Sequence, residues 1–129
     1  MKRQLTISSD PIDEPSLVAA RAMSAGMGAA VYFSGVVRAN EEGRTIAAIE
    51  YEAFPPMVEH QFELIFREME RRWPIESVRL VHRIGVVKVN EASLWVEVIA
   101  PHRGEAFAAG QFLIDEMKRG VPIWKKPLA

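Results

Sequence analysis

The chain has 129 residues, of which 49% are hydrophobic and 26% are charged, and its net charge at pH 7 is −1. This composition is typical of a folded domain, and a net charge near zero argues against general binding to nucleic acid or to an anionic membrane. Cysteine is absent, which excludes disulfides, thiolate zinc sites and any mechanism in which this chain carries sulfur as a thiolate. No apolar run is long enough to span a bilayer and no signal-peptide pattern is present, so a cytoplasmic location is expected.

The chain is predicted to begin with an edge strand and a short helix. Residues 4–9 alternate weakly between apolar and polar side chains, which is typical of an edge strand. Asp13 or Ser16 can cap a helix that runs to about Met23, because such side chains accept hydrogen bonds from the free N–H groups of a first turn.

Two strands joined by a polar loop are expected next. Residues 29–37 are rich in β-branched and aromatic side chains and predict a strand. The segment 40–44 (Asn-Glu-Glu-Gly-Arg) is predicted to be a polar loop, and 45–53 to be the strand that pairs with 29–37 in a hairpin.

A long amphipathic helix is predicted between Pro55 and Pro74, since proline is tolerated in a first turn and stops a helix. Its apolar residues recur at helical spacing on one face: Val58, Phe62, Ile65, Phe66, Met69 and Trp73. Residues 78–84, 85–88 and 94–100 are predicted to be extended.

A final helix is predicted over residues 103–119, with Gly120 just beyond its end and Pro122 as a stop. Its buried face is predicted to comprise Ala106, Phe107, Gly110, Leu113, Ile114 and Met117. About six strands and three helices in this order predict an α+β fold, with a mostly antiparallel sheet and the helices packed on one side, in a single domain spanning 1–129.

The stretch 101–126 gathers five permanent cations and one histidine around this last helix. In a protein that is otherwise near neutral, this grouping indicates a site for an anion. Arg38, at the end of the strand 29–37, is a further candidate because a guanidinium donates two hydrogen bonds at once to a phosphate. The alternative for Arg38 is a solvated loop charge.

His102 and Arg103 stand where the last helix begins. A cation is unfavourable at a helix N-terminus unless an anion is shared there, so Arg103 suggests a bound anion. The alternative is that Arg103 pairs with a carboxylate such as Glu50 or Glu97. His102 can donate to a phosphate or move a proton near neutral pH.

Lys118 lies in the last turn of the predicted helix, where a cation also stabilises the helix end, which is the alternative to a functional role. Lys125 follows the point where the chain turns back, and packing of Pro122 and Trp124 would hold it near Lys118. Two neighbouring ammonium groups are one arrangement in which a lysine becomes reactive.

The two ends of this helix cannot serve one small ligand within one chain. Arg103 and Lys118 are 15 residues apart, which is about 22 Å of helix at ~1.5 Å per residue. Either the chain has two sites, or a two-fold dimer brings the Arg103 end of one chain to the Lys118 end of another.

Other residue types predict no further chemistry. The acidic residues show no metal-binding spacing and no glycine-rich phosphate loop is present, so neither a metal nor another cofactor is expected. His60 and His82 lack comparable neighbours in the sequence and are interpreted as structural or surface residues.

The chain is similar to the large, catalytic subunit of molybdopterin synthase over most of its length. The resemblance rests on the order and spacing of Phe33–Arg38, Ile49–Met57, Arg72–Pro74, Val81–Gly85, His102, Arg103, Ala106, Phe107, Asp115, Lys118, Pro122, Trp124 and Lys125. The loop after Arg38 departs from the family, since it reads Ala-Asn-Glu-Glu-Gly in place of a more usual Asn-rich stretch.

This resemblance implies an α/β-hammerhead-like fold and a homodimer with a small ubiquitin-like sulfur carrier bound at each end, forming a heterotetramer. The carrier's C-terminal Gly-Gly thiocarboxylate would donate sulfur to cyclic pyranopterin monophosphate, giving the dithiolene of molybdopterin. Lys118 and Lys125 would be catalytic, and Arg38, His102 and Arg103 would bind the substrate. One alternative is a non-catalytic module that binds a ubiquitin-like tail. A small RNA-binding protein is disfavoured by the neutral charge and the lack of an aromatic stacking motif.

Overall fold

The computed structural model describes residues 1–129 and contains a four-stranded main sheet. Its strands, in spatial order, are β1 (Lys2–Ser8), β6 (Ser77–Arg83), β8 (Ala92–Ala100) and β2 (Ala29–Val36). The β1–β6 pair is parallel and the other two pairs are antiparallel. β1 is an edge strand, as the sequence predicts.

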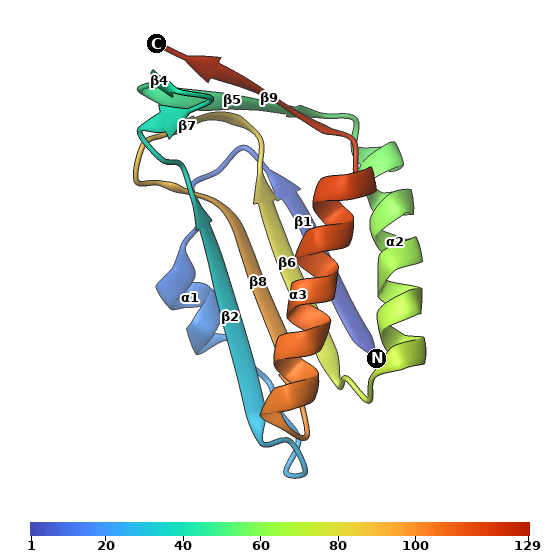
Figure 1. The fold of residues 1–129 in the computed structure, drawn as a ribbon. Coiled ribbons are helices and arrows are strands. Elements are labelled where there is room, and N and C mark those ends of the chain that lie inside the picture. The colour runs from blue at the N-terminus through green and yellow to red at the C-terminus, as the bar shows by residue number, and fades with distance from the viewer.

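A second sheet of three strands lies across one end of the main sheet (Figure 1). Its order is β7 (Gly85–Lys88), β5 (Ala48–Ala53) and β9 (Ile123–Leu128), and both of its pairs are antiparallel. This crosswise sheet and the long helical layer beside the main sheet confirm the predicted α+β, hammerhead-like fold. The segment 123–128, which follows the point where the chain turns back, is a strand.

The two long helices, α2 (Pro55–Arg72) and α3 (Arg103–Gly120), pack on one face of the main sheet (Figure 1). Both helices begin and end close to their predicted limits. Between them and the sheet lies a cluster of 16 buried residues that includes Phe62, Leu80, Val98 and Leu113. None of the helices combines the length and the apolar character needed to cross a membrane.

The short helix α1 (Glu14–Ala19) lies on the opposite face of the main sheet, so the prediction that all helices share one side is wrong. The reason is β8, which is buried along almost its whole length. Val96 and Val98 face the main cluster, and the alternating residues Trp95 and Glu97 need a cover on the other side. Asp13 caps α1 as predicted, accepting from the Ser16 N–H at 3.2 Å.

The predicted hairpin between 29–37 and 45–53 is also wrong, because β2 pairs with β8 while β5 pairs with β7 and β9. Ile49 of β5 packs with Val37, Ile46 and Val87 in a separate buried cluster, which draws β5 out of the main sheet.

The residues predicted as a loop, 40–44, belong to a small hairpin of β3 (Asn40–Glu41) and β4 (Arg44–Thr45). Its turn residues Glu42 and Gly43 both have positive φ, at 51° and 77°, which is the backbone form that a two-residue hairpin turn favours.

Three details of the helices differ from expectation. α1 ends at Ala19 instead of Met23. α3 includes Gly120, and Val121 ends it in an extended conformation, because a residue before proline avoids the helical region. Phe107 is 61% exposed, in contrast to its predicted burial.

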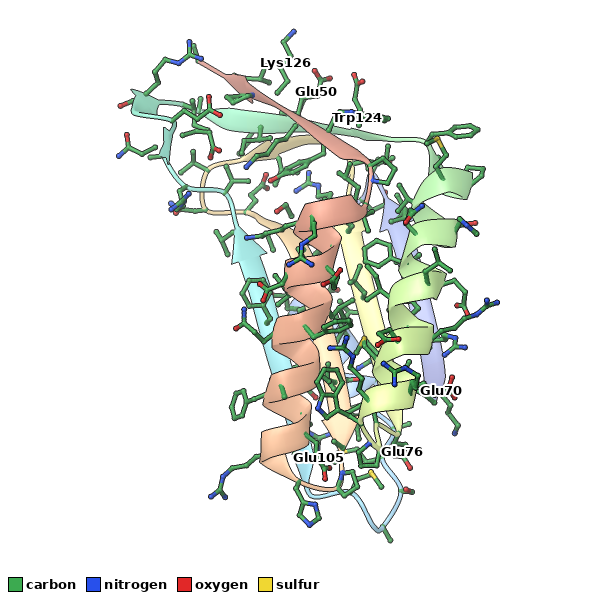
Figure 2. The ribbon with its side chains drawn as sticks, turned by 45° about the vertical axis from the view of Figure 1, so that its right-hand side comes forward. Glu50, Glu70, Glu76, Glu105, Trp124 and Lys126 are labelled. Atoms are coloured by element: carbon green, nitrogen blue, oxygen red, sulfur yellow. The ribbon has the colours of Figure 1, made fainter.

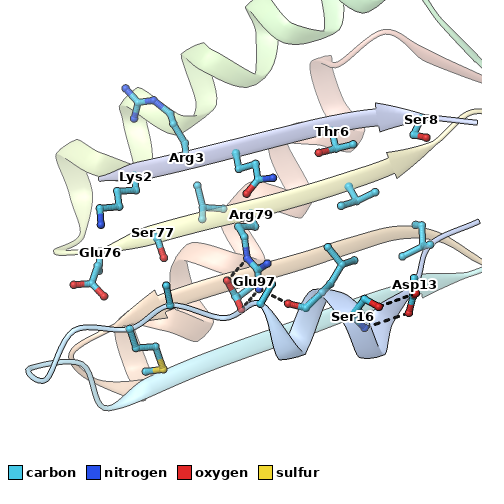
Figure 3. Close-up of a pocket in the computed structure, with 18 of the residues that line it drawn as sticks. Lys2, Arg3, Thr6, Ser8, Asp13, Ser16, Glu76, Ser77, Arg79 and Glu97 are labelled. Carbon is cyan, nitrogen blue, oxygen red and sulfur yellow. Dashed lines mark hydrogen bonds and ion pairs between the residues drawn. The ribbon is translucent and has the colours of Figure 1, made fainter. Parts of the chain in front are cut away.

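A buried ion pair joins the main sheet to α1. Arg79 of β6 donates to the two carboxylate oxygens of Glu97 at 2.6 and 2.7 Å, and it donates to the Leu17 carbonyl of α1 at 2.7 Å. The Glu97 side chain is only 1% exposed, and the Arg79 guanidinium also lies 5.1 Å from the centre of the Trp95 ring. Figure 3 shows this pair at the floor of the cleft between α1 and the sheet. The buried charges of Arg79 and Glu97 therefore neutralise each other.

We expect Arg79→Met to lower the free energy of unfolding by about 3–5 kcal/mol, because it leaves the Glu97 carboxylate buried without a cation. Urea denaturation followed by tryptophan fluorescence measures this loss. The double variant Arg79→Met, Glu97→Leu is the control and should recover most of the stability. Equal destabilisation by the single and double changes would contradict this account.

Candidate functional site

The candidate site is a cavity of about 600 Å³ where the main sheet meets the crosswise sheet. It collects three of the five predicted site residues, Arg38, Lys118 and Lys125, from segments far apart in the sequence. The cavity is also lined by Phe33, Glu41, Tyr51, His82 and Ser93.

The three cations reach the cavity from three different elements of the fold. Arg38 follows the end of β2, and Lys118 lies in the last turn of α3. Lys125 lies on β9 opposite Tyr51 of β5, and both side chains line the cavity. Since side chains alternate along a strand, Lys126 projects to the outer side of the crosswise sheet, beside Glu50 (Figure 2).

The tail that carries Lys125 is held by its backbone. The sequence predicts that Trp124 packs the tail in place, but this side chain is 57% exposed. The tail does not depend on burial of Trp124, because β9 is fixed by six paired positions along β5, from Ile123 opposite Ala53 to Leu128 opposite Ala48.

The cavity has an excess of positive charge. Glu41 of β3 is its only acidic lining residue, and its carboxylate oxygen Oε1 lies 3.0 Å from the Lys125 ammonium. Arg38 and Lys118 form no ion pair and no side-chain hydrogen bond within the chain, although many other surface cations do. Two cations are thus left available to an anionic ligand.

His82 lies in the lining of this cavity, a position that sequence reasoning missed. It is 5% exposed, and its Nδ1–H donates to the Arg83 carbonyl at 2.9 Å, which leaves Nε2 as an acceptor. Burial lowers the pKa of His82, and the hydrogen bond to the carbonyl offsets only part of that effect. The imidazole is therefore held neutral.

One aromatic contact and one hydroxyl hydrogen bond, both from Tyr51, fix the surroundings of His82. The Tyr51 ring meets the His82 ring edge-on, with 5.3 Å between centroids, and the Tyr51 hydroxyl donates to Ser93 Oγ at 3.3 Å. The available sequence signal is the alternation of β6, where Val78, Leu80 and His82 form one inward row. That row identifies His82 as inward but does not tell which end of the sheet carries the site.

His102 and Arg103 lie at the opposite end of α3 from this cavity. The helix is unbroken from Arg103 to Gly120, so the separation of about 22 Å between Arg103 and Lys118 holds in the structure. Figure 2 shows Glu105 near this end of α3 and Trp124 beyond the other. The structure of one chain therefore does not bring the five predicted residues together.

The side chains at this end of the helix are open to solvent. His102 is 79% exposed, with Nδ1 3.4 Å from a carboxylate oxygen of Glu105. Arg103 is exposed and forms no ion pair, and the alternative that it pairs with Glu97 is wrong because Glu97 is bonded to Arg79.

A larger cavity, of about 840 Å³, lies between α1 and the β1–β6 side of the main sheet (Figure 3). Its central charged groups are already paired, as Arg79 with Glu97 and Asp13 with Ser16. The smaller cavity is the better candidate because two of its three cations, Arg38 and Lys118, are unpaired. No group of three histidine or acidic residues able to hold a metal ion occurs in the chain.

The fold and the cavity define a small α+β protein with a cationic site at the junction of two sheets. A comparison with known families gives the more specific class: residues 7–120 match the family described as "MoaE protein". The chain belongs to this family.

Two curated relatives illustrate the similarity. The molybdopterin synthase catalytic subunit of Bos taurus is 40% identical over 101 residues, which are 78% of this chain and 53% of that protein. The protein of the same description from Staphylococcus carnosus is 42% identical, over 78% of this chain and 67% of its own length. The chain spans about half the length of the mammalian relatives it matches.

Solved structures agree over nearly the whole chain. A molybdopterin synthase structure from Staphylococcus aureus has a TM-score of 0.88 and 34% identity, covering 99% of this chain and 92% of that one. A MoaE protein from Burkholderia ambifaria gives 0.85 and 38%, covering 98% and 82%. A complex of subunits 1 and 2 of molybdopterin-converting factor from Helicobacter pylori, at 20% identity and a TM-score of 0.78, shares the fold and covers 97% of this chain and 83% of that one.

The lowered pKa of His82 predicts a pH-dependent stability. Above its ordinary value of 6.5, both folded and unfolded chains hold a neutral imidazole. As the pH falls below that value, the unfolded chain binds a proton that the folded protein does not, so the free energy of unfolding should fall until the lowered pKa is reached.

Chemical denaturation of wild type and His82→Gln between about pH 7 and pH 5 tests this, with an expected difference of ~1.4 kcal/mol per unit of pKa depression. Glu68, whose pKa is lowered to about 2 by hydrogen bonds from Arg71 and Arg72, loses its stabilising contribution mainly below its ordinary value of 4.5, and it does so equally in both proteins. Parallel pH profiles for the two proteins would show that His82 titrates normally.

Proposed function

We propose that the chain is the catalytic subunit of a molybdopterin synthase, a sulfurtransferase of molybdenum cofactor biosynthesis acting in the cytoplasm. Its substrate is cyclic pyranopterin monophosphate, and its sulfur donor is the thiocarboxylated C-terminus of a small ubiquitin-like carrier. The observation that carries the proposal is the convergence of Arg38, Lys118 and Lys125 on one cavity in a member of the MoaE family.

The absence of cysteine supports a donor that arrives on a partner. A chain without a thiol cannot hold the transferred sulfur itself, so the sulfur has to be delivered at the site. A thiocarboxylate and a substrate phosphate are both anions. The unpaired Arg38 and Lys118, together with Lys125, give them cations to bind in a protein whose net charge is only −1.

The geometry suggests a division of roles among these cations. Arg38 offers a planar pair of donors for the phosphate. Lys118 and Lys125 approach the same cavity from α3 and β9, where an ammonium group can stabilise charge on the attacked acyl group or transfer a proton to the substrate. Two sulfurs per product require two loaded carriers in succession, with the intermediate held by its phosphate contacts.

His102 and Arg103 belong in this proposal through a homodimer. The outer edge of β2 is unpaired, and two aromatic side chains are exposed near it, Phe33 at 39% on β2 and Phe107 at 61% on α3. If two chains meet along this edge about a two-fold axis near the middle of α3, the helices run antiparallel. The Arg103 end of one chain then lies beside the Lys118 end of its partner, and one interface completes two sites.

Lys118→Ala should reduce dithiolene formation by at least about 100-fold, because it removes a charged group from the reacting centre. The assay mixes the protein with thiocarboxylated carrier and cyclic pyranopterin monophosphate and follows the product. Lys125→Ala should behave similarly. The matched control is Lys126→Ala, which removes the neighbouring lysine on the outer side of β9 and should stay within about twofold of wild type.

Undiminished product with Lys118→Ala would remove this lysine from the mechanism. No product with wild type, combined with retained binding of the carrier, would favour the non-catalytic module that only docks a ubiquitin-like tail.

Complementation tests the shared site. Arg103→Ala and Lys118→Ala chains should each be nearly inactive alone, and a mixed dimer of the two should contain one intact site and one doubly altered site. Random mixing makes half of the dimers mixed, so we expect about a quarter of wild-type activity from co-expressed chains. Activity no greater than the sum of the separate variants would place the two helix ends in independent sites.

A further inference from the structure

Glu41 is the one feature of the cavity that opposes anion binding. It is the only acidic side chain in the lining, and it contacts the Lys125 ammonium at 3.0 Å. Its side chain is 12% exposed, so this carboxylate is largely enclosed by the cavity, while Lys125 remains 53% exposed. A ligand can therefore approach the ammonium from solvent, but Glu41 already occupies its inner side.

The two partners differ in how firmly they are held. Lys125 lies within a strand that pairs with β5 over six positions. Glu41 lies on the two-residue strand β3, which pairs only with β4 through Asn40–Thr45 and Glu41–Arg44. This hairpin joins neither larger sheet, and its turn residue Glu42 has φ of 51°, which carries a cost for a residue with a side chain.

The base of the hairpin is fixed more firmly than its arms. The Ile46 N–H donates to the Ala39 carbonyl at 2.7 Å, and the Ile46 side chain is buried with Val37 and Ile49. Between residues 40 and 45, no backbone hydrogen bond joins the hairpin to the main sheet or to β9. Movement of Glu41 away from Lys125 is therefore local.

We propose that Glu41 is an internal competitor for the anion that binds Lys125. In the free protein Glu41 neutralises Lys125; when an anionic ligand enters, the ammonium exchanges the Glu41 carboxylate for the ligand and the 40–45 hairpin moves aside. Glu41 thereby weakens anion binding and makes it depend on a conformational step. The ligand class is a carboxylate-type chain end or a phosphate, and only the identification of these as carrier and substrate rests on the proposed function.

The test compares Glu41→Gln with Glu42→Gln. Both changes remove one negative charge from neighbouring positions of one hairpin, but only Glu41 contacts Lys125, while Glu42 is exposed at the turn. Each protein is titrated at fixed ionic strength with inorganic phosphate and, separately, with a short peptide ending in Gly-Gly-COO⁻. The same peptide with an amidated end serves as the uncharged control, and backbone amide NMR shifts report the binding.

We expect Glu41→Gln to bind one or both anions about three- to fivefold more tightly than wild type, the upper part of the range for a partly exposed charge pair. Glu42→Gln should stay within about twofold, and the amidated peptide should show no such gain. The ligand that binds more tightly to Glu41→Gln identifies whether the peptide's carboxylate or the phosphate contacts Lys125. In wild type, the Gly43 amide should shift on saturation, since the hairpin moves.

Unchanged or weaker anion binding by Glu41→Gln would overturn the proposal, as would an equal gain with Glu42→Gln or no measurable binding by any of the proteins. A thermal melt verifies that each variant is folded. Because these titrations need neither the carrier nor the pterin, failure of the dithiolene assay leaves their outcome intact, and the two hypotheses can fail separately.

Discussion

The structure depends on the double-sided burial of β8. Eight of its nine residues are buried, so both faces of the main sheet must be covered along this strand. The helical layer of α2 and α3 buries one row, and α1 covers the other. The second row includes a carboxylate, Glu97, which is tolerated there only because Arg79 donates two hydrogen bonds to it. A strand fixed in this way gives β2 and β6 a rigid common neighbour.

The candidate site lies where this rigid body ends. Main-sheet strands, the last turn of α3 and the crosswise sheet all reach the same cavity, so its cations are held by elements that pack for independent reasons. The positive charge of the cavity arises from position and not from composition, because the whole chain is close to neutral. The length of α3 keeps the other two predicted site residues away from the cavity. It holds His102 and Arg103 at a fixed distance from the cavity, so they can reach a site of this kind only on a second chain.

Local sequence patterns were sufficient for the helices and for part of the site. Proline at Pro55 and Pro74 and the spacing of apolar residues define α2, and the reversal after α3 brings Lys125 toward Lys118. Strand partners were not predictable in the same way, since pairing of β5 with β7 and β9 is decided by burial of Ile49 in a second cluster that involves distant residues. The same limit explains His82 and Glu41. Their residue types are visible in the sequence, but their positions in the cavity follow from how two sheets meet.

Because Lys125 lies on the final strand, the main core can be folded while the cavity is still incomplete. None of the 16 buried residues of the main cluster comes from β9, which touches that cluster only through the half-buried Ile123, and a second cluster of four buried residues lies under the crosswise sheet. Detachment of the final strand would remove a cation from the cavity while the larger core stays packed. Far-UV circular dichroism reports chiefly on that core, which contains the long helices, whereas tryptophan fluorescence combines Trp73 and Trp95 with Trp124 of the last strand. A sample with a native circular dichroism spectrum can therefore lack a complete site, and a signal from Trp124 itself is needed to show that the last strand is in place.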